Sequence, residues 1–115
     1  MKRRLSTFEE FWPYYVSQHA HPATRALHSL GTSLAVATAA AALTLSLPLW
    51  LLAVPLAGYG PAWIGHFFVE KNRPATFTHP LWSLRGDLRM YRLMWMARME
   101  PELARLREAQ PTRAG

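Results

Sequence analysis

The chain has 115 residues, and its 13 Lys and Arg outnumber its 7 Asp and Glu to give a formal charge of +6 at pH 7. The basic charge accompanies no nucleic-acid-binding motif, and basic segments are expected beside anionic lipid, so we expect no nucleic-acid partner. Because the chain has no cysteine, it forms no disulfide and no thiolate metal site, and any metal must be bound by His, Asp or Glu.

The first predicted element is an amphipathic helix over residues 8–18. Ser6 or Thr7, followed three residues later by Glu9 or Glu10, is the pattern of a capping box at a helix N-terminus. Pro13 falls within this helix and is expected to shorten or kink it. Aromatic side chains recur at helical spacing, at Phe8, Phe11, Trp12 and Tyr15.

A long segment without charge follows, from Ser29 to Val69. It is roughly twice the length of about 20 apolar residues that one membrane crossing needs, and Pro48 lies near its midpoint. The sequence therefore predicts a helical hairpin with spans over 22–47 and 49–70. All 13 Lys and Arg lie outside the charge-free segment, which predicts that both termini are cytoplasmic and, in a bacterium, that the chain lies in the inner membrane.

The outgoing span contains two prolines and two glycines, which predict a kinked or discontinuous helix, at Pro55, Gly58, Gly60 and Pro61. Beyond it, residues 81–99 combine an apolar face with an arginine face, the pattern of an interfacial or re-entrant helix. Residues 101–115 are expected to form an exposed tail. The predicted fold class is all-α, a single membrane domain over 1–115 with two to four membrane-associated helices, and the sequence leaves the oligomeric state open.

The hairpin places histidines at one depth. At about 1.5 Å per residue, His28 to the turn and the turn to His66 cover roughly 28 Å and 25 Å, so the two imidazoles return to the same level. His19 and His79 have plausible routes to that level from the flanking helices. Glu70 follows His66 by four residues, which puts a carboxylate on the same helix face. Two histidines and one carboxylate suit Fe(II), although the spacing does not fix the metal.

The sequence allows two alternative roles for each of several other polar residues. Asp87 is either a salt-bridged surface acid or a residue that orients a ligand imidazole. Lys71 and Arg73 belong either to a stop-transfer cluster or to a site. Arg25, Lys71, Arg73 and Arg85 are available to bind a substrate anion at the interface.

Three motifs resemble one known family. They are Tyr15-x-x-x-His19, His28-x-x-Gly31, and Gly65-His66-x-x-x-Glu70-Lys71 followed by Pro74-Ala75. From about residue 8 to about residue 90 the chain is similar to the membrane 2-hydroxy fatty acid dioxygenases, a former domain-of-unknown-function family, and to its short bacterial branch.

The resemblance implies an Fe(II) cofactor, a fatty acyl substrate and O2, and alpha-oxidation with loss of one carbon. It implies catalytic and metal-binding roles for His19, His28, His66 and Glu70, whereas His21, His79 and Asp87 are weaker alternatives as ligands. The competing functions are a non-catalytic membrane scaffold or lipid-binding protein, and another metal-dependent lipid enzyme such as a hydroxylase.

Overall fold

In a computed structural model that describes residues 5–109, every regular element is helical, which confirms the predicted all-α class. In chain order the elements are α1 (Phe8–Ser17), α2 (Pro22–Thr44), η1 (Pro48–Leu52), α3 (Ala53–Ile64), η2 (Gly65–Glu70), η3 (Ala75–Phe77), α4 (Pro80–Trp95) and α5 (Met99–Ala109).

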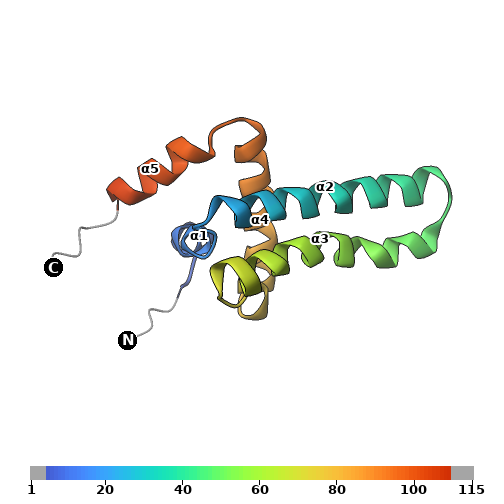
Figure 1. The fold of residues 1–115 in the computed structure, drawn as a ribbon, viewed down its shortest axis with the longest axis horizontal. Helices are drawn as coiled ribbons and strands as arrows, with labels where there is room; N and C mark the ends of the chain where they lie inside the picture. Colours follow the sequence, from blue (N-terminus) through green and yellow to red (C-terminus); the bar gives the residue numbers. More distant parts are fainter. Residues whose placement is uncertain (1–4, 110–115) are drawn as a thin grey trace.

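The predicted hairpin is formed by α2 and the returning segment η1, α3 and η2. The two arms run side by side, and α4 crosses them near the open end of the hairpin (Figure 1). Gly31 of α2 faces Gly58 of α3 so closely that a Cβ on Gly31 would collide with the carbonyl oxygen of Gly58. The close approach of the backbones therefore requires glycine at position 31.

Two helical stretches are long and apolar enough to cross a membrane, Pro22–Thr44 with mean hydropathy 1.4 and Pro48–Glu70 with 1.2. Only 17% of each apolar window is buried within the molecule, whereas a core helix of a soluble protein is mostly buried. Large apolar side chains point outward instead, as at Leu43, Leu52 and Leu56, each more than 70% exposed. Such a continuous apolar surface is typical of contact with lipid.

The returning arm is helical from Pro48 to Glu70, and its α-helix continues through Pro55, Gly58, Gly60 and Pro61, where the sequence predicted a kink or a break. What changes along the arm is the type of helix. It begins as a 3₁₀-helix from Pro48, becomes α-helical over Ala53–Ile64, and ends as a π-helix over Gly65–Glu70. Lys71 then adopts a left-handed conformation with φ of 59°, which turns the chain back on itself. This turn brings Asn72 beside the end of the hairpin.

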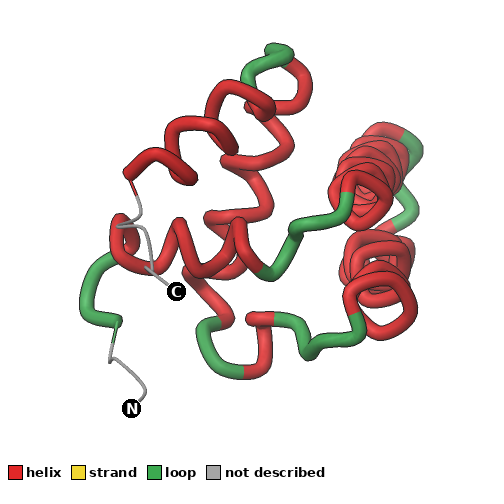
Figure 2. Tube along the Cα trace, turned by 60° about the vertical axis from the view of Figure 1, so that its left-hand side comes forward, coloured by secondary structure: helices red, strands yellow, loops and turns green. Residues whose placement is uncertain are grey.

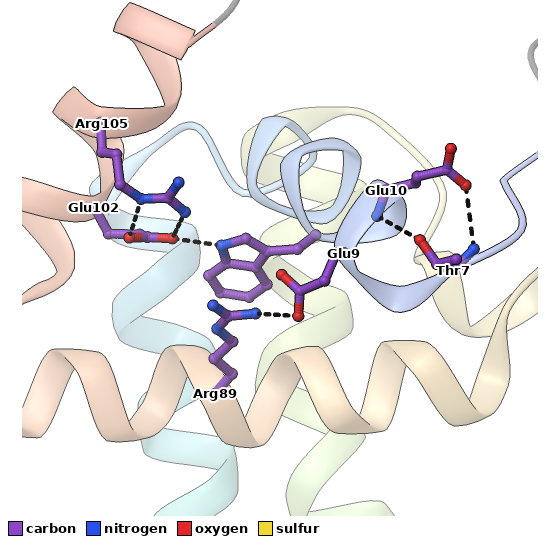
Figure 3. A network of polar contacts seen from close by, with 7 residues as sticks. Thr7, Glu9, Glu10, Arg89, Glu102 and Arg105 are labelled. Carbon is purple, nitrogen blue, oxygen red and sulfur yellow. Dashed lines mark hydrogen bonds and ion pairs between the residues drawn. The ribbon is translucent and has the colours of Figure 1, made fainter.

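The remaining helices form a second packing unit at the open end of the hairpin, which Figure 2 views nearly along its arms. Helix α1 carries the capping box predicted at its start, between Thr7 and Glu10 (Figure 3), and it continues through Pro13 to Ser17. Its aromatic residues pack against α4 and α5 in a core that includes Phe11, Trp12 and Met90. An ion-paired network joins α1 to both helices, because Trp12 donates to Glu102 and Glu9 lies 3.6 Å from Arg89 (Figure 3).

The C-terminal region differs from the expectation of an exposed tail after a helix over 81–99. Helix α4 ends at Trp95, and Ala97, with φ of 55°, redirects the chain into α5. Met99 and Leu106 of α5 are buried in the core with α1, because this helix has an apolar face that can cover it. The rest of the predicted tail, 110–115, lies outside the described residues.

Candidate metal centre

Three histidines from separate parts of the chain meet at the open end of the hairpin. His19 follows α1, His28 lies on the first turns of α2, and His66 lies on η2. All three are buried, and one ring nitrogen from each lies within 4.8 Å of the others. The ring centroids are 4.3 to 4.9 Å apart with nearly perpendicular planes. We call this set the histidine triad.

The Nδ1 atoms of the triad face hydrogen-bond acceptors. His19 Nδ1 lies 2.6 Å from the carbonyl oxygen of Tyr15, and His28 Nδ1 lies 2.9 Å from that of Thr24. A carbonyl oxygen only accepts, so each Nδ1 must carry the proton. In the neutral imidazole, Nε2 then presents a lone pair. Both of these partners lie one helical turn before the histidine.

Asn72 fixes the third ring, and the sequence analysis did not identify it. Its Oδ1 lies 2.7 Å from His66 Nδ1, while its Nδ2 donates to the backbone carbonyl of Gln18 at 3.1 Å. The second bond fixes which side of the amide is oxygen, so His66 Nδ1 is the donor. Asn72 reaches His66 only because Lys71 reverses the chain, and no helical spacing predicts that.

The triad therefore presents three unprotonated nitrogens to one point. His19 Nε2 and His28 Nε2 are 3.0 Å apart, and neither has a proton to share in the neutral form. A cation among them removes this conflict, and imidazole nitrogens with a hydrogen-bonded Nδ1 are the arrangement found around protein-bound metals. The donor set, nitrogen only, suits Fe, Zn, Cu or Ni.

The electrostatic environment of His19 keeps it ready to bind a metal. Burial is the main reason that the pKa of His19 lies well below the ordinary value of 6.5, and the charge of His28 acts in the same direction. The Tyr15 ring stacks on the His19 ring with centroids 4.0 Å apart. A neutral, sterically held imidazole is the form that ligates a metal.

Glu70 does not join the histidine triad. Its Oε2 accepts a hydrogen bond of 2.6 Å from the backbone N–H of His21 at the start of α2. The first N–H groups of a helix have no partner within it, so they attract a carboxylate. The carboxylate of Glu70 therefore contacts the start of α2, and among the described residues the metal-binding group contains only the three histidines.

The other two histidines also lie apart from the triad. His21 is the N-cap of α2, and its Nδ1 accepts from the backbone N–H of Ala23. His79 packs against the rings of Phe11 and Trp82 and is stacked on Trp82 with centroids 5.6 Å apart. Both contacts are structural ones.

Asp87 lies beside the histidine triad without belonging to it. It lines a small cavity together with His28 and His66. The Tyr15 hydroxyl donates a short hydrogen bond to it, and Tyr15 is a second residue that the sequence analysis did not identify as part of the site. Burial raises the pKa of Asp87 to about 7, an effect that the Tyr15 bond opposes. Asp87 thus contacts the ring that stacks on His19.

The four predicted substrate-binding cations have different surroundings. Arg25 donates to the carbonyl oxygens of His19 and Ala20 and is buried, so it fixes the link between α1 and α2. Arg85 lies over the Phe8 ring at 4.1 Å, on the side of α4 that faces α1. Lys71 and Arg73 are exposed beside the end of η2.

Comparison with known protein families gives a match over most of the chain. The family model described as 2-hydroxy-palmitic acid dioxygenase Mpo1-like covers residues 5–99. No curated protein and no solved structure matches the chain. The matched range contains every residue of the histidine triad together with Asn72 and Asp87.

Proposed function

The chain belongs to the Mpo1-like family, and on this premise we propose that it is an iron(II)-dependent dioxygenase of 2-hydroxy fatty acids at a membrane surface. The observation that carries the proposal is the convergence of three buried imidazoles whose Nδ1 atoms are all bound elsewhere. The family description names a dioxygenase, and such chemistry on an unactivated acid requires a metal or another cofactor.

The reaction that we propose is alpha-oxidation. The bond between C1 and C2 of the 2-hydroxy acid breaks, C1 leaves as carbon dioxide, and C2 becomes the carboxyl carbon of an acid one carbon shorter. The substrate loses four electrons, and one O2 accepts them, with water as the remaining product. A bound Fe(II) would supply the oxygen chemistry that amino-acid side chains lack.

The ligands that we propose are His19, His28 and His66, which leave further positions on an iron ion for a chelating substrate and for oxygen. Tyr15, Thr24 and Asn72 hold the rings in the tautomer that such an ion requires. Glu70, bound to the start of α2, contributes by fixing the position of the helix that carries His28. This role replaces direct ligation by its carboxylate.

Lys71 and Arg73 are the cations that we propose attract the substrate carboxylate. They are exposed at the end of the π-helix that bears His66, and Arg73 also lies over the Phe77 ring at 5.3 Å. Arg25 is buried by its bonds to backbone carbonyls, and Arg85, although exposed, lies over the Phe8 ring on the side of α4 that faces α1. Attraction of the anion by exposed cations at a lipid surface acts at long range and falls with salt.

The test is incubation of the iron-loaded protein with 2-hydroxypalmitate and O2, read by mass spectrometry of the product. The proposal predicts pentadecanoate from the wild type and from His79→Ala, and none from His28→Ala. His79→Ala is the matched control, since it removes a histidine that lies outside the triad. A product that gains oxygen and keeps all its carbons would identify a hydroxylase, and absence of any product from protein that retains iron would favour a scaffold.

A further inference from the structure

Two cavities meet at the histidine triad. The larger, about 370 Å³, lies between α2, α3 and α4. The smaller holds about 10 Å³, room for about one water-sized group, and includes His66 and Trp63 in its lining. The two share His28, Tyr59, Ala62 and Asp87, so they form one continuous space with a small polar end and a long apolar end.

We infer that the larger cavity, which we call the hairpin groove, binds the hydrocarbon chain of the substrate along the inner side of the hairpin, with its methyl end between Ala39 and Val54. This inference rests on the proposed function for the identity of the head group. It assigns the hydrocarbon chain of the substrate a binding site inside the protein. If that hydrocarbon chain lay in the bilayer instead, lipid would occupy the groove.

The lining of the hairpin groove suits a saturated chain. Beyond Thr32 its walls in the hairpin are aliphatic until the groove ends. Four of the lining residues are small: Ala35, Ala39, Gly58 and Ala62. The small residues leave space where larger ones would close the gap between α2 and α3. An apolar groove within the depth of two candidate spans excludes water, so a hydrocarbon is the chemistry that fills it.

The length of the groove sets the length of chain that fits. From His28 to Ala39 the α2 helix rises about 16 Å, the length of an extended chain of roughly a dozen carbons. A long-chain acid, with its carboxyl end among the histidines, matches this length.

The polar end of the space contains an unused hydrogen-bond donor. Within residues 5–109, the buried Nε1 of Trp63 has no acceptor. A buried N–H without a partner costs free energy, so an acceptor is expected there. Trp63 lines the small cavity beside His66, where the oxygen atoms of a bound head group would lie if the chain occupied the groove.

The test is photo-crosslinking of the protein in nanodiscs with a palmitate analogue that carries a diazirine near its methyl end, followed by peptide mapping. The inference predicts labels on the segments 35–39 and 54–58. It further predicts that Ala39→Phe lowers this labelling about tenfold, because the new ring displaces two or more methylene groups. Ala40→Phe is the matched control, since Ala40 is exposed and lines neither cavity.

Val54→Phe provides a second variant from the opposite helix, should Ala39→Phe fail to fold. Labels concentrated on outward-facing leucines, or groove labelling unchanged by both substitutions, would overturn the inference. The readout needs neither iron nor turnover. Groove labelling in a protein that forms no shortened product would refute the proposed dioxygenase activity and leave the chain-binding role of the hairpin groove standing. A shortened product without groove labelling would refute the chain-binding role alone.

Discussion

His19 Nε2 and His28 Nε2 lie 3.0 Å apart, although the other nitrogen of each ring faces a backbone carbonyl. Two neutral imidazoles in these tautomers direct lone pairs at each other, which is unfavourable without a cation. Nitrogens bound at right angles to one ion, each about 2.1 Å from it, would be about 3 Å apart. The spacing therefore suits two ligands of one metal ion.

Asn72→Leu should weaken metal binding by about 10- to 100-fold, because His66 loses the acceptor that fixes its tautomer and orientation. The measurement is competition for iron with a chelator of known affinity. Gln18→Ala is the control: Asn72 bonds the backbone carbonyl of Gln18, so removing that side chain should leave the affinity unchanged. Equal affinities for Asn72→Leu and the wild type would contradict this role.

The sequence predicted the hairpin and the depth of its histidines because both depend on one-dimensional features, a charge-free segment and a central proline. It did not predict Asn72 as a partner of His66, because that contact depends on the left-handed conformation of Lys71. Nor did it predict the packing of α5, because Leu106 packs in a core with residues of α1, almost a hundred positions earlier in the sequence.

Glu70 illustrates what helical spacing can predict about a side chain and what it cannot. Glu70 follows His66 by four residues, and this spacing predicts that its carboxylate lies on the same helix face as the His66 ring. The spacing does not identify the partner of this carboxylate, which is the backbone N–H of His21 at the N-terminus of α2. A local pattern therefore identified a polar position and could not identify its partner.

Gly31→Ala should destabilise the fold by about 2 kcal/mol, because the new methyl group collides with the carbonyl oxygen of Gly58 and separates α2 from α3. Gly60→Ala is the matched control on α3. A Cβ there meets nothing within 4 Å, so the substitution should be neutral or stabilise by up to about 1 kcal/mol. Thermal unfolding of both variants in one detergent makes the comparison, and equal shifts would contradict close packing at Gly31.

Glu102→Gln should remove an acid-sensitive part of the stability. The hydrogen bond from Arg105, aided by that from Trp12, lowers the pKa of Glu102 from 4.5 to about 2 (Figure 3). A depressed pKa contributes stability above the unfolded value, and this is lost as the pH falls from about 4.5 to about 2.

The measurement is the unfolding midpoint of the wild type and Glu102→Gln over that pH range. The difference between the two should shrink on acidification. Glu108→Gln changes an exposed glutamate on the same helix and should follow the wild type at every pH. A constant difference between wild type and Glu102→Gln would show that the carboxylate has no stabilising charge interaction.

Asp87→Asn should change the pH dependence of the stability in the direction opposite to that of Glu102→Gln. Burial raises the pKa of Asp87 from 3.8 to about 7, so the folded state binds a proton that the unfolded state has released. This group therefore lowers stability as the pH rises from about 4 to about 7, by on the order of 1.4 kcal/mol per pH unit. In metal-free protein, Asp87→Asn should gain stability relative to the wild type over this range, measured by denaturant unfolding. A relative stability independent of pH would contradict the raised pKa.

The most direct test of the histidine triad is the iron K-edge X-ray absorption spectrum of the iron-loaded protein. The account predicts one iron ion with scattering from three imidazoles, and loss of bound iron in His28→Ala but not in His21→Ala or His79→Ala. An iron environment with at most one imidazole, or the same spectrum from His28→Ala, would contradict it.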